Sequence, residues 1–188
     1  ANNNALFGYN AGTAITTGDD NTAIGHNALL VCTEGLKNTA LGRGALQSNI
    51  TGSENTAVGY AALVTTTGED NVAVGHNALY GQQDADFNTA VGHSAMQSTT
   101  VGSYNTGIGK GAMFLNTTGQ YNTALGYAAL VSNVDGDKNV AVGSEALYTM
   151  EADTDGHGNN IAVGYRAGYG LTTGTENILI GGLAGDAL

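Results

Sequence analysis

The chain has 188 residues, a formal net charge of −11 and only 11% charged residues, so its acidity disfavours nucleic acid and anionic membranes as partners. The single cysteine excludes a disulfide framework within the chain, and no run of 18 apolar residues indicates a membrane-spanning helix. A hydrophobic fraction of 41% is too high for a disordered chain. We therefore expect a folded protein with no nucleic-acid partner and no membrane insertion.

A unit that begins with asparagine recurs along the chain. Eight of the ten spacings between successive copies are 17 residues, one is 16 and one is 21. A fixed period near 20 residues is the signature of a solenoid, in which each copy forms one coil. We predict a single repeat domain over residues 1–188. Its copies begin at Asn4, Asn21, Asn38, Asn55, Asn71, Asn88, Asn105, Asn122, Asn139, Asn160 and Asn177.

Repeat positions are numbered from this asparagine, which is position 1. Positions 2 to 4 combine Thr, Val or Ile with a small residue and then a large aliphatic one, which is typical of a short strand. Alternation in a strand puts positions 2 and 4 on one face and position 3 on the other. We expect the larger residues of positions 2 and 4 to fill the interior, and the alanines of position 3 to form a flat outer face.

The rest of the repeat predicts a closed coil. Glycine at position 5 of every copy indicates a corner with φ > 0 or with no space for a side chain. Ala at position 8 and Leu or Met at position 9 should return the chain over the core in a second short extended piece, and a glycine at position 15 indicates a turn. Helix is excluded because each interior glycine would cost a helix about 1 kcal/mol. The predicted fold class is all-β, a parallel β-roll or β-solenoid.

Asparagine at position 1 suits a structural role. In stacked coils its side chains can form an amide ladder that satisfies backbone groups along the rod. Ligand binding is the alternative. The expected ladder consists of Asn21, Asn38, Asn55, Asn71, Asn88, Asn105, Asn122 and Asn139.

The motif Asn-Thr-Ala-Val-Gly, followed after two further residues by Ala, resembles the YadA-like head repeat of trimeric autotransporter adhesins. It is also similar to β-roll repeats of phage tail fibres. The resemblance implies a left-handed β-roll, a homotrimer, and an extracellular, cell-surface or virion-surface location. The chain departs from the adhesin pattern in its longer period and in Ala at position 8, where that family often has Ser.

These features predict a structural or adhesive fibre subunit that acts through many weak contacts, with itself and a surface or glycan ligand as partners. We expect no catalytic activity, because nearly uniform coils do not gather different reactive side chains. The alternatives are a phage or virus tail-fibre shaft and an ice- or polysaccharide-binding solenoid. Ice binding would use the position-2 threonines, which we expect inside. These are Thr22, Thr39, Thr56, Thr89, Thr106 and Thr123.

The outermost copies are unusually apolar and carry glycine at position 9. Since an unclosed contact between unlike ends propagates, we expect rods to stack head-to-tail into a filament. A longer fibre cut at these points is the alternative. The expected end-to-end contact residues are Leu6, Phe7, Leu179, Ile180 and Leu183.

No metal site is assigned. His26, His76 and His93 share position 6 with tyrosines and cationic residues, which indicates stacking on an outward corner. Acidic loops could bind calcium, the only cofactor considered, although solvated loops explain them as well. The weak calcium candidates are Glu151, Asp153 and Asp155, within a loop over residues 148–159 that we expect to protrude.

Overall fold

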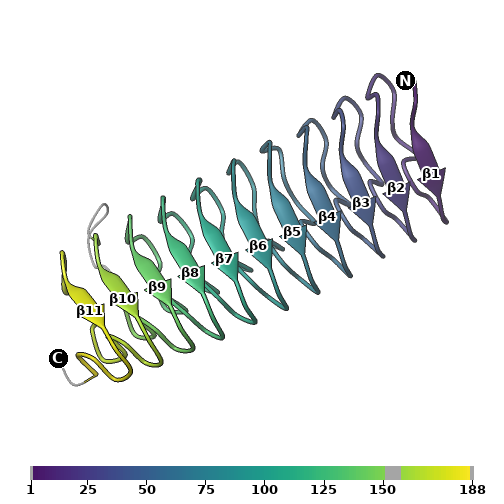
Figure 1. Cartoon of the computed structure of the whole chain (residues 1–188). Coiled ribbons are helices and arrows are strands. Elements are labelled where there is room, and N and C mark those ends of the chain that lie inside the picture. The colour runs from purple at the N-terminus through teal and green to yellow at the C-terminus, as the bar shows by residue number, and fades with distance from the viewer. Residues whose placement is uncertain (1, 151–157, 187–188) are drawn as a thin grey trace.

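The computed structural model describes residues 2–150 and 158–186, which form a parallel β-solenoid without helices in this described part (Figure 1). Eleven strands of three residues lie in chain order in one sheet, and each occupies positions 2 to 4 of one copy. The predicted solenoid is confirmed. The strands are β1 (Ala5–Phe7), β2 (Thr22–Ile24), β3 (Thr39–Leu41), β4 (Thr56–Val58), β5 (Val72–Val74), β6 (Thr89–Val91), β7 (Thr106–Ile108), β8 (Thr123–Leu125), β9 (Val140–Val142), β10 (Ile161–Val163) and β11 (Ile178–Ile180).

Each strand residue pairs with the residue at the same repeat position in the next coil, as Thr22 pairs with Thr39. The register is unchanged between β4 and β5, across the 16-residue spacing, and between β9 and β10, across the 21-residue spacing. Both irregular copies therefore accommodate their length change outside the sheet. Residues at one repeat position form a straight column along the rod.

The interior is lined by the small residues of the strands. Ala23, Ala57 and Ala90 at position 3 are fully buried, whereas Leu41 and Leu125 at position 4 are 44% and 46% exposed. The prediction that positions 2 and 4 fill the interior and that the alanines form the outer face is wrong. The physical reason is that Leu or Met at position 9 enters the interior from the opposite wall, so that only a small residue fits at position 3.

Positions 3 and 9 share one space. Gly107 replaces alanine at position 3 where Met96 and Met113 occupy position 9, and a Cβ on Gly107 would lie 2.8 Å from Met96 Cγ. In the first coil the exchange is reversed, because Leu6 stands at position 3 and Gly12 at position 9. A Cβ on Gly12 would lie 2.6 Å from Leu6 Cδ2. These exchanges keep the interior volume nearly constant, as close packing requires.

Gly107→Ala is therefore expected to destabilise the fold by about 1–3 kcal/mol through overpacking. Met96→Leu alone should cost less than about 1.5 kcal/mol, because the two side chains have similar volumes. Combined with Gly107→Ala, it restores the Ala-and-Leu pairing of other coils and should recover part of the loss. Urea unfolding of the three variants measures this coupling. A double variant no more stable than Gly107→Ala alone would contradict the shared space.

The walls between strands are turns, so the predicted second extended piece is not found in the described residues. Position 9 adopts left-handed backbone conformations although it carries Leu or Met, with φ of 49° at Leu46 and 52° at Met96. Such a conformation costs a residue with a Cβ about 1–2 kcal/mol. Since these side chains are fully buried, the interior packing that they provide offsets that strain.

Candidate functional surface on the outer face of the sheet

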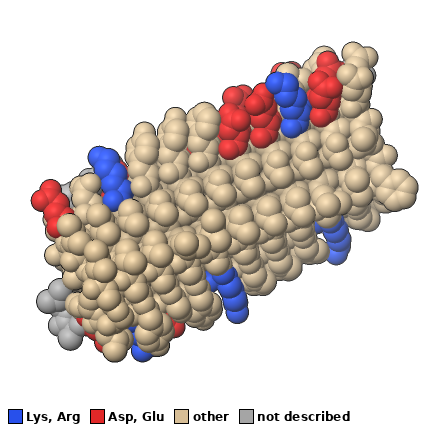
Figure 2. Space-filling model, in the orientation of Figure 1, with Lys and Arg blue, Asp and Glu red and all other residues tan. Residues whose placement is uncertain are grey.

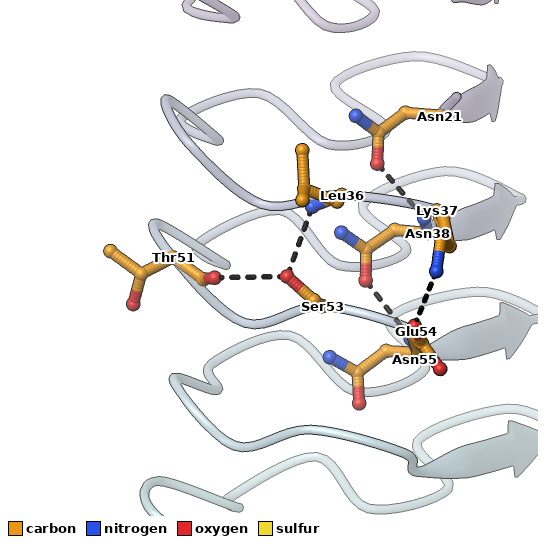
Figure 3. Close-up of polar contacts among 8 residues, drawn as sticks. All are labelled: Asn21, Leu36, Lys37, Asn38, Thr51, Ser53, Glu54 and Asn55. Carbon is orange, nitrogen blue, oxygen red and sulfur yellow. Dashed lines mark hydrogen bonds and ion pairs between the residues drawn. The ribbon is translucent and has the colours of Figure 1, made fainter. Parts of the chain in front are cut away.

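The asparagines of position 1 lie inside the rod and join its coils. Asn21 Oδ1 accepts the backbone N–H of Asn38 at 2.9 Å, and Asn38 Oδ1 accepts that of Asn55 at 3.0 Å (Figure 3). Asn38 Nδ2 donates to the carbonyl oxygen of Gly52 at 2.9 Å. The same pair of bonds recurs in the following coils up to Asn122. Both ends of each amide are engaged within the protein, which is a structural role.

A second polar column occupies the interior at position 12. Asn133 Nδ2 donates to Asn116 Oδ1 at 2.7 Å, one coil away. Cys32 stands at the same position, where burial raises the pKa of its thiol and the Sγ–H group donates to Gly35 O. A buried thiol that stays protonated is a poor nucleophile. Position 12 therefore contributes packing and hydrogen bonds between coils.

The outward residues of positions 2 and 4 form two columns on the sheet, and no residue at either position is charged. Figure 2 shows this face as a flat band without Lys, Arg, Asp or Glu, which runs the length of the rod. The position-4 column is aliphatic apart from Phe7. The position-2 threonines, such as Thr56 and Thr106, lie on this outer face and are half-buried, so the prediction that they lie inside is wrong.

Position 6 forms a ridge along one edge of this face. The rings of Tyr60 and His76 stack with centroids 5.0 Å apart, and those of His76 and His93 stack at 4.9 Å. Arg43 lies over the Tyr60 ring at 5.6 Å, and His26 stacks on the ring of the preceding coil. The predicted outward stacking is found. Within the described residues, no three His, Cys, Asp or Glu side chains are grouped so that they could hold a metal ion.

Position 17 forms the ridge along the other edge. Phe87, Tyr104 and Tyr121 stack with centroid distances of 4.9 and 5.0 Å. In another part of this ridge, Lys37 Nζ lies 2.7 Å from Glu54 Oε1 (Figure 3). This hydrogen bond raises the pKa of Lys37 and lowers the pKa of Glu54, so both groups stay charged at neutral pH. The ridge combines exposed rings with charges of both signs.

Acidic residues at position 16 bind backbone groups of the adjacent coil. Asp86 Oδ1 accepts the N–H of Glu69 at 2.8 Å, and Ser53 Oγ accepts the N–H of Leu36 at 3.1 Å in the same way (Figure 3). This function was missed from the sequence, although the recurrence of Asp and Ser at one position was a signal for it. The calcium candidates lie outside the described residues: Glu151, Asp153 and Asp155.

The residues predicted for end-to-end contact divide into two groups. Phe7 and Ile180 stand outward at position 4 and are 77% and 70% exposed, and Leu183 is also exposed. Leu6 and Leu179 stand at position 3, where Leu179 packs against the core and Leu6 is 45% exposed. Leu179 therefore contributes to the core of its coil, Leu6 remains exposed at the other end, and the contact between rods stays a prediction.

The described part of the chain contains no helix of the length and apolar character needed to cross a membrane. No protein-family model, curated protein or solved structure matches this chain. The functional argument therefore rests on the columns and ridges of the rod itself.

Proposed function

We propose that this protein is a structural segment of an extracellular or virion-surface fibre, in which three copies of the rod associate side by side through the outer face of the sheet. The observation that carries the proposal is the flat, uncharged band of positions 2 and 4. Soluble monomers rarely expose long contiguous apolar patches. The alanines expected to make this contact are buried inside the coil, so the contact is assigned to positions 2 and 4.

The face is large enough for a stable interface. Eleven strands spaced by about 4.8 Å give a length of about 50 Å, and the outward residues from position 17 to position 6 span about 20 Å. The product is about 1,000 Å² per copy. Since each copy of a trimer shares this face between two neighbours, each pairwise contact buries about 1,000 Å² in total, which reaches the lower bound of a specific interface. The number of copies follows from the resemblance of the Asn-Thr-Ala-Val-Gly motif to trimeric adhesin heads.

The two ridges support a closed ring. When parallel rods turn their sheets toward a common axis, the position-6 ridge of one copy lies beside the position-17 ridge of the next. Position 6 carries Arg43, Lys110 and three histidines but no carboxylate. Position 17 carries four carboxylates, two lysines and three stacked rings, which is a net negative charge. Opposed charges and cations beside aromatic rings favour this contact over one between identical ridges.

The combined substitutions Val58→Lys and Ile108→Lys are expected to dissociate the trimer into single folded chains. Both side chains point outward at position 4, so a single chain tolerates lysine there, while an apolar interface would have to bury unpaired charges. Sedimentation velocity distinguishes the 18.9 kDa chain from a particle of three times that mass. Val131→Lys, at position 10 away from the sheet face, is the matched control and should stay assembled. Wild-type protein that sediments as a single chain at every concentration would refute the proposal.

Ice or polysaccharide binding is a second candidate function, favoured by the outward position of the threonines. Thr22, Thr39 and Thr56 form an uninterrupted run with one hydroxyl about every 4.8 Å along a flat face. Ice binding predicts thermal hysteresis from the single-chain species and its loss in Thr39→Tyr. Absence of hysteresis in the wild-type protein rejects ice binding without affecting the assembly proposal.

A further inference from the structure

A recess interrupts the side of the rod next to the position-6 ridge. It has a volume of about 510 Å³ and lies at coil 4, the copy that begins at Asn55. This coil carries shorter side chains than the next coil at two positions. Position 7 is Ala61 in coil 4 but Asn77 in coil 5, and position 10 is Val64 in coil 4 but Tyr80 in coil 5. The coil-4 recess therefore lies where the shorter side chains of coil 4 meet the longer ones of coil 5.

The lining of the coil-4 recess combines aromatic rings with amide groups and contains no charged residue. Tyr60 and Tyr80 are half-exposed. Gln47, Asn77 and Gln97 add three side-chain amides, and none of these amides hydrogen-bonds to another residue within the described part of the chain. Each amide offers two donors and an acceptor to a bound molecule.

The two tyrosines present different surfaces to the recess. Tyr60 is enclosed between His76 and Arg43, so its edge and hydroxyl remain available. Rings at position 10 face their neighbours along the rod, as the stacked pair Tyr148 and Tyr169 shows with centroids 5.0 Å apart. Tyr80 stands at the same position, and no other ring of the described residues stacks on it. Since Val64 is too short to cover the ring, one face of Tyr80 borders the recess.

We propose that the coil-4 recess binds a neutral hexopyranose unit of a glycan. The C–H face of the sugar packs on the open ring face of Tyr80, and the amides of Gln47 and Asn77 pair with its hydroxyl groups. The volume lies within the range of small-molecule sites. An uncharged lining disfavours phosphates, sulfated sugars and metal ions, which need opposite charges or anionic ligands.

This inference rests on the adhesive part of the proposed function and gives it a ligand class. It does not require assembly, because the recess lies within a single chain. Its lining shares Tyr60 with the position-6 ridge but contains no residue of positions 2 or 4. The dissociated variant with Val58→Lys and Ile108→Lys should therefore keep its glycan affinity. Loss of assembly and loss of binding can thus be observed separately.

The test fills the recess with residues that neighbouring coils already use. Ala61→Asn with Val64→Gln reproduces position 7 of coil 5 and position 10 of coil 3. Ala61 has a φ of 51°, a conformation that asparagine tolerates better than alanine, so the double variant should fold at least as well as the wild-type protein. Tyr80→Ala removes the stacking ring instead. Tyr9→Ala, an exposed tyrosine at position 6 three coils away, is the matched control.

Isothermal titration calorimetry with maltohexaose, cellohexaose and chitohexaose, and with a heparin hexasaccharide as charged probe, measures binding. At least one neutral hexasaccharide should bind, with affinity at least about tenfold weaker in Tyr80→Ala and in the filled variant, and unchanged in Tyr9→Ala. No binding of any neutral probe at millimolar concentration would overturn the proposal. Binding that survives filling of the recess, or preference for the heparin fragment, would overturn it as well.

Discussion

Gly75→Ala is expected to abolish stable folding or to cost more than about 4 kcal/mol of unfolding free energy. A Cβ on Gly75 would lie 2.4 Å from the carbonyl oxygen of Gly92 and 2.7 Å from its carbonyl carbon. Both are backbone atoms of the next coil, and they cannot retreat without breaking the pairing of β5 with β6. The φ of 138° at Gly75 adds strain for any residue with a Cβ. Thermal unfolding followed by circular dichroism measures the loss.

Gly111→Ala is the control that separates the steric clash with the next coil from the strain of a left-handed backbone. Gly111 has a φ of 67°, but a Cβ there would meet nothing within 4 Å. This variant should lose only about 1 kcal/mol, from conformational strain alone. Equal losses in Gly75→Ala and Gly111→Ala would show that the close approach of coils at position 5 does not determine stability.

The strands and the position-5 corner could be predicted because each has its own residue types at a constant spacing. In a solenoid a shared repeat position means a shared place, so recurrence alone locates the coil and its register. The inward face of the strand could not be deduced in this way, because alternation separates two faces without saying which one is enclosed. Placing the larger residues inside neglected the leucines that enter from the opposite wall.

The exchanges between positions 3 and 9 were the overlooked signal. Gly107 coincides with Met96 and Met113, and Leu6 coincides with Gly12. Whenever position 3 or position 9 carries a larger side chain, the other position carries a smaller one. This exchange indicates that the two positions face each other across the interior. Comparing columns with one another would therefore have identified the buried face.

The coil-4 recess was hidden for a related reason. It depends on Ala61 and Val64 being shorter than Asn77 and Tyr80 at the same positions of coil 5, a difference that appears only when the two coils are compared. The bonds made by Asp86 and Ser53 also join coils and not sequence neighbours. In a rod of this kind, the useful sequence comparison runs across copies at a single position.

Asn88→Ala is expected to cost about 2–6 kcal/mol, because two buried backbone groups lose their partners at about 1–3 kcal/mol each. Asn88 is fully buried, its Oδ1 accepts the N–H of Asn105 at 2.9 Å, and its Nδ2 donates to Gly102 O at 2.8 Å. Asn27→Ala, at the half-buried position 7, is the control. The Asn27 side chain accepts only a 3.4 Å bond from Asn10, and its φ is 57°, so the control should lose about 1 kcal/mol, chiefly from backbone strain. Urea unfolding measures both variants.

Asn88→Asp tests whether a hydrogen-bond donor is needed at Gly102 O, because the substitution makes that bond depend on pH. The carboxylate keeps the acceptor for Asn105 but turns a second acceptor toward Gly102 O, whereas the protonated acid can donate there. Burial and the facing carbonyl raise the folded-state pKa of this new carboxyl group above its unfolded value of about 3.9. Its stabilising contribution is therefore present below that value and lost as the pH rises through the folded pKa. Relative to the wild-type protein, the variant should be more stable at pH 4 than at pH 7. A deficit that is independent of pH would mean that the donor bond from residue 88 to Gly102, which closes the coil, does not contribute to stability.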